Sequence, residues 1–148
     1  QIRQKAMSHN QLEHFSKTAL QLARSYQATV LINENIPLAQ TLQADGVHLT
    51  AAQLRSLHSR PAVNWCGASC HNEQELQRAE RLGVDFVTLS PVQPTLSHPG
   101  AAALGWKEFA ALIRDYPLPV YALGGLLPAD LETAREYGAH GIAMMRSI

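Results

Sequence analysis

The sequence predicts an α/β protein built on a (β/α)₈ barrel. Short apolar or β-branched runs alternate with helical patterns along all 148 residues, which is typical of a parallel sheet with helical crossovers. Three predicted strands are each entered from a helix through a short turn with a glycine after the helix, at 44–46, 82–85 and 137–141. An open doubly wound sheet shares the alternation, but the repeated turn favours the quasi-equivalent units of a barrel.

The first third of the chain predicts a long helix between short strands. Ser8 and Gln11 have the spacing of a capping box, and apolar side chains then recur every three to four residues, as in Leu12, Phe15 and Ala19. The elements predicted here are a strand end at 1–3, the helix after Ser8, a strand at 29–32, a helix at 38–42, a strand at 46–49 and a helix at 51–57.

The remainder continues the alternation and brings the number of predicted strands to seven. Asn72 and Glu75 form a second capping-box pattern that opens a helix to about Leu82. The other elements predicted here are strands at 65–69, 86–89, 119–123 and 141–145, helices at 106–113 and 129–137, and a proline-rich loop at 91–104. We expect the first strand and helix of the barrel to lie upstream of Gln1, and the last helix to follow Ile148.

Composition indicates a single domain over 1–148. The chain is 46% hydrophobic, and its 12 Lys+Arg balance 12 Asp+Glu, which argues against a broad electrostatic grip on nucleic acid or anionic lipid. No apolar run has the length of a membrane helix, and two cysteines are too few for a disulfide framework. We therefore expect a cytoplasmic protein. Cys66, Cys70 and His48 are interpreted as core residues, and His48 as hydrogen-bonded there.

Polar side chains follow the predicted strands, at the barrel end where function usually lies. Gln1, Arg3 and Lys5 alternate along the first strand end, so they share one face and supply donors that suit a phosphate. Asn33 and Glu34 follow the next strand. Polar turns and a solvated strand end are the alternative interpretations of these residues.

Two later loops form a second group of candidates. The loop 90–100 is stiffened by three prolines and carries hydroxyl side chains and His98, whose side chain titrates near neutral pH. Gly124 and Gly125 follow a strand, and Arg146 follows the next one. In barrels of this class the loops after the last two strands often form a phosphate site.

The ordered set of these motifs resembles thiamine-phosphate synthase and its thiazole tautomerase relative. The resemblance covers nearly the whole chain and rests on Q-I-R-Q-K, L-I-N-E-N, A-D-G-V-H-L, G-A-S-C-H, P-T-L-S-H, A-L-G-G-L and G-I-A-M-M-R-S-I. It implies a reaction in which the nitrogen of a thiazole phosphate attacks a pyrimidine diphosphate, with Mg²⁺ assisting the departure of pyrophosphate.

The resemblance also implies roles for individual residues. Gln1, Arg3, Lys5 and Asn33 would hold the diphosphate, Arg3, Lys5 and Ser69 would act in catalysis, and Ser69 would line the pyrimidine site. Thr95, Ser97, His98, Gly124, Gly125 and Arg146 would bind the thiazole phosphate or its surroundings. Glu34 would be the remaining metal ligand.

Several positions depart from the family pattern and leave Mg²⁺ doubtful. Glu34 and Gln53 stand where the family has two aspartates, His98 replaces a lysine, and Arg146 replaces a serine. The tautomerase is not clearly matched either, because its catalytic histidine corresponds to Pro91. Mg²⁺ is typically held by one or two carboxylates together with substrate phosphates, so losing one weakens that site.

The run 83–106, together with L-P-V-Y-A-L-G-G-L at 118–126, resembles the C-terminal domain of bacterial fusion proteins in which a MutT-type Nudix hydrolase domain comes first. Three functions therefore stay open for the chain. The first is a thiamine-phosphate synthase-like enzyme. The second is a catalytically degenerate module that binds a phosphorylated ligand beside an upstream Nudix domain, and the third is a purely structural domain. A homodimer is a further partner that the sequence leaves open.

Overall fold

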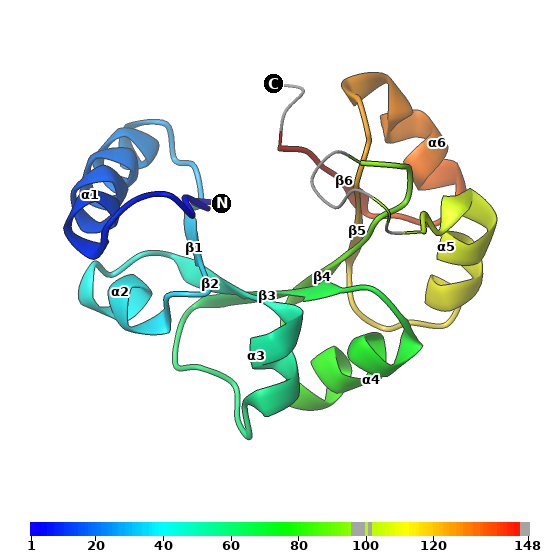
Figure 1. Cartoon of the computed structure of the whole chain (residues 1–148), viewed down its shortest axis with the longest axis horizontal. Helices are drawn as coiled ribbons and strands as arrows, with labels where there is room; N and C mark the ends of the chain where they lie inside the picture. Colours follow the sequence, from blue (N-terminus) through cyan, green and yellow to red (C-terminus); the bar gives the residue numbers. More distant parts are fainter. Residues whose placement is uncertain (96–99, 101, 146–148) are drawn as a thin grey trace.

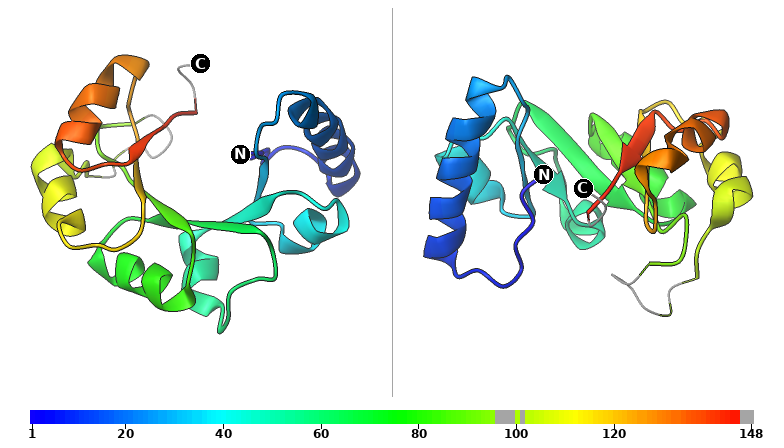
Figure 2. Two further views of the ribbon diagram at one scale, coloured as in Figure 1. Left: turned by 180° about the vertical axis from the view of Figure 1, so that it is seen from behind. Right: turned by 90° about the horizontal axis from the view of Figure 1, so that it is seen from above.

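The computed structural model describes residues 1–95, 100 and 102–145. Its six parallel strands pair in the order in which they occur along the chain. The strands are β1 (Leu31–Asn33), β2 (Gly46–Leu49), β3 (Trp65–Cys70), β4 (Phe86–Leu89), β5 (Val120–Leu123) and β6 (Gly141–Ala143). The sheet curls into a half-barrel with helices on its convex side, as Figures 1 and 2 show. The predicted barrel-type fold is thus confirmed for the part of the barrel that this chain spans.

The helices alternate with the strands as predicted. They are α1 (His9–Ser25), α2 (Ile36–Thr41), α3 (Ala51–Ser56), α4 (Glu73–Leu82), α5 (Gly105–Ile113) and α6 (Leu131–Glu136), with a 3₁₀ turn η1 (Pro128–Asp130) before α6. Among the described residues, no helix combines the length and the apolar character needed to cross a membrane.

The predicted strand at 1–3 is wrong, because this segment forms a single bridge. The Ile2 N–H donates to the Leu31 carbonyl at 2.8 Å, the Asn33 N–H donates to the Ile2 carbonyl at 2.9 Å, and the pairing ends there. Buried Ile2 nevertheless anchors the segment beside β1, with Gln1 and Arg3 on either side of it. Two other predicted strands, at 29–32 and 141–145, are shorter or shifted in the structure.

The two capping-box predictions have different outcomes. At α1 the box is complete, since the Ser8 N–H donates to Gln11 Oε1 at 2.9 Å and the Gln11 N–H donates to Ser8 Oγ at 3.4 Å. At α4 only half of it exists. Asn72 Oδ1 accepts from the Glu75 N–H, but the Glu75 carboxylate accepts from the His71 N–H and from Arg55.

Two of the three predicted glycine turns have the expected backbone conformation. Gly83 and Gly138 have φ of +76° and +90°, so they end their helices in the left-handed conformation that glycine favours. The same prediction for Gly46 is wrong. Gly46 begins β2 beside Trp65, where a Cβ atom would lie 2.0 Å from the Trp65 carbonyl oxygen, and Gln43 takes the positive φ before it.

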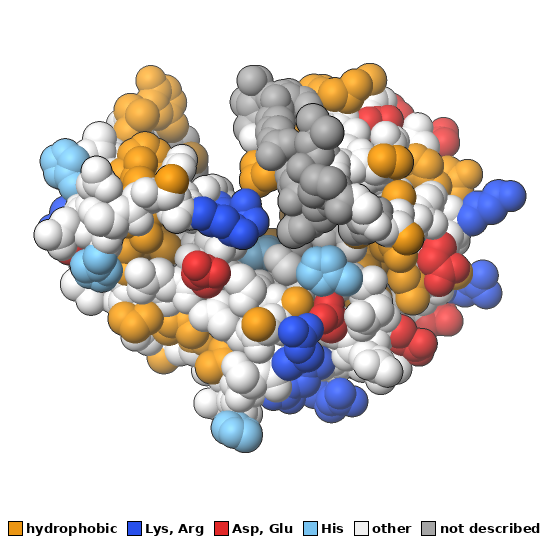
Figure 3. Space-filling model, in the orientation of Figure 1, with side chains coloured by type: hydrophobic (Ala, Val, Ile, Leu, Met, Phe, Trp, Pro, Cys, Tyr) orange, Lys and Arg blue, Asp and Glu red, His pale blue; other side chains and the backbone are white. Residues whose placement is uncertain are grey.

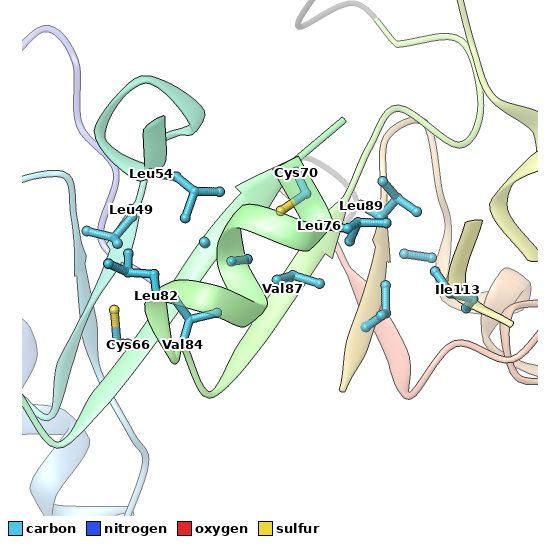
Figure 4. Close-up of a cluster of buried hydrophobic side chains, with 14 of the residues drawn as sticks. Leu49, Leu54, Cys66, Cys70, Leu76, Leu82, Val84, Val87, Leu89 and Ile113 are labelled. Atoms are coloured by element: carbon cyan, nitrogen blue, oxygen red, sulfur yellow. The ribbon is translucent and has the colours of Figure 1, made fainter. Parts of the chain in front are cut away.

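The core lies between the convex side of the sheet and the helices. Outward-facing strand residues fill it together with helix residues such as Leu54, Leu76 and Phe109, and Figure 4 shows part of this cluster. Both cysteines belong to this layer and are free thiols, as predicted. The opposite, concave face carries His48, Ser69 and Thr88 together with the rings of Phe86 and Tyr121, and the carboxyl ends of all six parallel strands form one rim of the sheet.

The burial of the two thiols predicts that they are unreactive. Burial raises the pKa of Cys66 to about 11 and that of Cys70 to about 12, and the thiolate is the reactive form. Native protein incubated with iodoacetamide at pH 8 should therefore remain unlabelled at both positions, whereas protein unfolded in urea should be labelled at both. Rapid labelling of either cysteine in the native state would contradict this packing.

Candidate functional site: an anion pocket at the rim of the sheet

A pocket opens at the carboxyl rim of the sheet, where the segment 2–5 passes β1. It has a volume of about 250 Å³ and is lined by Ile2, Arg3, Gln4, Lys5, Leu12, Asn33, Glu34, Asn35 and Pro37. Two cationic side chains and one carboxylate therefore share this pocket. Figure 3 shows that blue Lys and Arg side chains gather beside the notch that separates the two lobes of the molecule.

The single bridge at Ile2 assembles the pocket. Gln1 Nε2 donates to Asn33 Oδ1 at 2.8 Å, which joins two of the predicted diphosphate ligands directly. Arg3 is half-buried, and its Nη1 lies 3.5 Å from the sulfur of Met145, just beyond β6. Arg3 therefore spans the opening between the first and last described parts of the sheet. The structure brings together Gln1, Arg3, Lys5, Asn33 and Glu34, as the sequence predicts.

Glu34 is held by its backbone and leaves its side chain exposed. Its φ is +55°, its N–H donates to the His48 carbonyl at 3.0 Å, and its carbonyl accepts from the Ile36 N–H at 3.1 Å. A third contact comes from Gln53, whose Nε2 donates to the same carbonyl at 2.7 Å. No ion pair joins Glu34 to Arg3 or Lys5 in the part of the chain that the structure describes.

The sequence did not lead us to expect that Gln53 contacts this site through the Glu34 carbonyl. Its Oε1 accepts from the Thr50 N–H at 3.2 Å, and its own N–H donates to Thr50 Oγ1 at 3.2 Å, so the pair forms a capping box for α3. The signal was present in the sequence, because Thr50 and Gln53 have capping-box spacing. Both ends of this carboxamide are thus engaged, one with α3 and one with Glu34.

The donor set of the pocket does not fit a protein-held divalent cation. Mg²⁺ prefers carboxylates and other oxygen ligands in a near-octahedral arrangement. Glu34 is the one carboxylate among the residues that line the pocket. The Gln53 oxygen faces Thr50, and its amide group directs protons, not lone pairs, toward Glu34. Within the described residues, no group of three or more His, Cys, Asp or Glu side chains could hold a metal.

A second cluster lies at the other end of the rim, after β4 and β5. The Val92 N–H donates to the Leu123 carbonyl at 2.9 Å and the Gln93 N–H donates to the Gly124 carbonyl at 3.0 Å, so the loop runs beside the two glycines. Thr95 follows two residues later. The structure therefore places Thr95 close to Gly124 and Gly125, whereas Ser97, His98 and Arg146 lie outside the described residues.

The loop also explains why glycine occupies both positions. A Cβ atom on Gly124 would lie 2.8 Å from Pro91 Cα, and one on Gly125 would lie 2.5 Å from the Pro94 carbonyl oxygen. Both glycines have positive φ, of +106° and +69°. The pair thus seats the loop 91–95 against the end of β5, in addition to leaving backbone accessible for a ligand.

Ser69 lies between the two clusters. It pairs in register with Thr88, and its neighbours Ala68 and Cys70 point into the helix-covered core, so Ser69 faces the concave side of the sheet. Its side chain is half-buried. This central position is compatible with a ligand that extends from one cluster to the other.

His48 is buried on the same concave face, and one expectation about it is wrong. Its ring is 2% exposed and lies 5.8 Å from the Phe86 ring, which confirms a core position. However, neither ring nitrogen has a hydrogen-bond partner among the described residues, nor does the buried Thr88 hydroxyl on β4. Burial lowers the pKa of His48 to about 4.

This lowered pKa makes stability depend on pH. In the unfolded chain the imidazole binds a proton near pH 6.5, whereas the folded protein resists protonation until about pH 4. The unfolded state thus binds more protons, and the free energy of unfolding should fall by about 1 kcal/mol per pH unit as pH drops through this window. Urea unfolding between pH 7 and pH 4.5 measures this slope, and His48→Leu should flatten it. An equal slope in both proteins would contradict the burial.

A curled parallel sheet with outer helices, and with a pocket lined by two cationic side chains at its carboxyl rim, defines the barrel-type class of this protein. The family model described as thiamine monophosphate synthase matches residues 1–148. The chain therefore belongs to the thiamine monophosphate synthase family.

Individual relatives agree with this assignment. The chain is 37% identical over 145 residues to a candidate thiamine-phosphate synthase 2 of Aquifex aeolicus, covering 97% of this chain and 78% of the relative. It is 29% identical over 154 residues to the thiamine-phosphate synthase of Desulfitobacterium hafniense, covering 100% of this chain and 73% of that protein. The thiamine phosphate pyrophosphorylase structure from Pyrococcus furiosus superposes with a TM-score of 0.79 at 26% identity, covering 96% of this chain and 69% of that one.

Proposed function

We propose that this domain catalyses thiamine-phosphate synthesis, joining a pyrimidine diphosphate to a thiazole phosphate with release of pyrophosphate. The observation that carries the proposal is the rim pocket, where Arg3 and Lys5 line one cavity beside the hydrogen-bonded pair Gln1 and Asn33. A guanidinium group binds phosphate oxygens in a fork, and an ammonium group adds a point charge. Family membership supports the same chemistry.

The residues present account for the steps of such a reaction. The bond between the pyrimidine methylene carbon and the diphosphate oxygen breaks, and its electron pair leaves with pyrophosphate. The thiazole nitrogen supplies the electron pair of the new C–N bond. Arg3 and Lys5 stabilise the charge that develops on the departing pyrophosphate. In this proposal Thr95, Gly124 and Gly125 hold the thiazole phosphate at the far end of the rim, and Ser69 faces the pyrimidine between them.

A condensation assay tests the proposal. The protein is incubated with both substrates, and thiamine phosphate and pyrophosphate are quantified together. Equal amounts of the two products are expected, with no pyrophosphate released when the thiazole phosphate is omitted. Absence of thiamine phosphate under saturating substrates, from protein that still shows cooperative unfolding, would contradict the synthase activity.

Gln53 directs an N–H group toward Glu34 and offers no oxygen there to a metal ion. This favours one alternative function, in which the domain binds the same phosphorylated ligands without joining them. In this case the domain presents a ligand to another domain, such as a Nudix hydrolase in the same protein. The two functions differ in one readout. A binding module would bind thiazole phosphate or thiamine phosphate by calorimetry and produce no condensation product, whereas the synthase would do both.

A further inference from the structure

The charge balance of the rim pocket sets which form of its ligand it accepts. Arg3 and Lys5 contribute two positive charges and Glu34 one negative charge, so the lining carries a formal excess of one positive charge. A pyrophosphate anion is therefore attracted by the protein itself. A pocket built around a metal–diphosphate complex would need further carboxylates to fix the cation, because Mg²⁺ takes oxygen ligands in a demanding geometry.

Gln53 contacts the backbone of Glu34 from outside the residues that line the pocket. Its carboxamide nitrogen lies 2.7 Å from the Glu34 carbonyl oxygen, at the edge of the pocket. The Gln53 amide donates a hydrogen bond to the Glu34 carbonyl, so this oxygen already has a partner. The amide N–H group also carries partial positive charge, whereas a metal ligand must offer a lone pair. The opposite end of the carboxamide is occupied by the Thr50 N–H, so rotating the amide would break the α3 capping box.

We propose that this pocket binds a diphosphate as the free anion, without a resident divalent cation, and that Gln53 determines this preference. The inference rests on the proposed function, since it concerns the same pocket. In this inference the negatively charged Glu34 carboxylate repels the diphosphate and does not bind a metal ion. Arg3 and Lys5 then supply the charge neutralisation that a cation would otherwise provide.

Calorimetry with inorganic pyrophosphate as the probe tests this inference on the full chain. In EDTA the wild-type protein should bind pyrophosphate. Added Mg²⁺ should leave the Kd unchanged or raise it, because Mg²⁺ sequesters the free anion in solution. A site that needs the metal would show the opposite, with affinity at least tenfold higher in Mg²⁺.

Two variants separate the roles of the side chains. Gln53→Asp adds a carboxylate beside Glu34 and should make binding weaker in EDTA and stronger in Mg²⁺. Gln77→Asp adds the same charge on α4, where the Gln77 side chain contacts Glu73 instead of Glu34, and should leave both values unchanged. Glu34→Gln removes the repelling charge, so pyrophosphate should bind about threefold or more tightly in EDTA. This last variant keeps the test decisive even if Gln53→Asp unfolds.

The outcomes distinguish the inference from the function on which it rests. Binding that appears only with Mg²⁺, or that is abolished by Glu34→Gln, would overturn metal independence while leaving the synthase proposal standing. A failure to bind pyrophosphate with and without Mg²⁺ would overturn both. Metal-independent binding that Gln53→Asp converts to metal-dependent binding would establish Gln53 as the determinant.

Discussion

Replacing Arg3 with alanine is expected to weaken pyrophosphate binding between about tenfold and a hundredfold. The charge-assisted hydrogen bonds of a guanidinium group with phosphate contribute about 1.5–3 kcal/mol, and about 1.4 kcal/mol corresponds to tenfold in Kd. Arg3 is half-buried in the pocket and reaches across the opening to Met145, and Lys5 in the same pocket supplies a charge but no planar fork. Isothermal titration with pyrophosphate in EDTA measures the loss.

Arg24 provides a matched control for this experiment. It lies exposed in the last turn of α1, away from the pocket lining, so Arg24→Ala removes the same charge from the domain without touching the site. Arg3→Lys should recover part of the lost affinity, since it restores the charge and not the planar fork. Equal affinities in wild type and Arg3→Ala would show that the pocket is not the diphosphate site.

The second large effect is expected from Gly125→Ala. The new Cβ would lie 2.5 Å from the Pro94 carbonyl oxygen at a φ of +69°, so the loop that carries Thr95 must move away from β5. We expect at least about a tenfold loss in affinity for thiazole phosphate, the size of losing one charge-assisted contact. Pyrophosphate binding at the other end of the rim should be unchanged.

Gly83→Ala separates backbone strain from loop displacement. Gly83 has a similar φ of +76°, but a Cβ atom there meets nothing within 4 Å. It should therefore cost about 1–2 kcal/mol of stability from the left-handed conformation alone, and leave both ligand affinities intact. If Gly83→Ala and Gly125→Ala reduced thiazole-phosphate binding equally, the loss would reflect general destabilisation and the glycine pair would have no specific role.

The alternation of helices and strands was predictable because the strands are buried under helices, and this burial requires apolar residues at regular places along the sequence. Outward-facing residues such as Val47, Ala68 and Val87 are fully buried under helices, and this leaves apolar runs that mark each strand. The end of the sheet at 1–3 was not predictable from such a run. Whether an edge segment pairs as a strand depends on its neighbours, and here Ile2 alone forms the bridge.

The site was predictable where it depends on topology and not where it depends on side-chain partners. Parallel strands bring their carboxyl ends to one rim, so Arg3, Asn33 and Glu34 could be expected to meet. The contact between Gln53 and the Glu34 carbonyl spans 19 positions and depends on how the start of α3 meets the turn after β1. Similarly, it could not be foreseen that the His48 ring nitrogens have no hydrogen-bond partner among the described residues, because a sequence does not state which polar groups lie opposite them.

The most direct test of the account is whether the two ends of the rim bind their phosphates independently. Thiazole phosphate is titrated into the protein by calorimetry, first alone and then in the presence of saturating pyrophosphate. Because the Arg3 pocket and the Gly124–Gly125 loop are separate clusters on opposite sides of Ser69, thiazole phosphate should bind with unchanged or higher affinity in the second titration. Competitive displacement of one ligand by the other would show a single phosphate site and contradict the proposed arrangement.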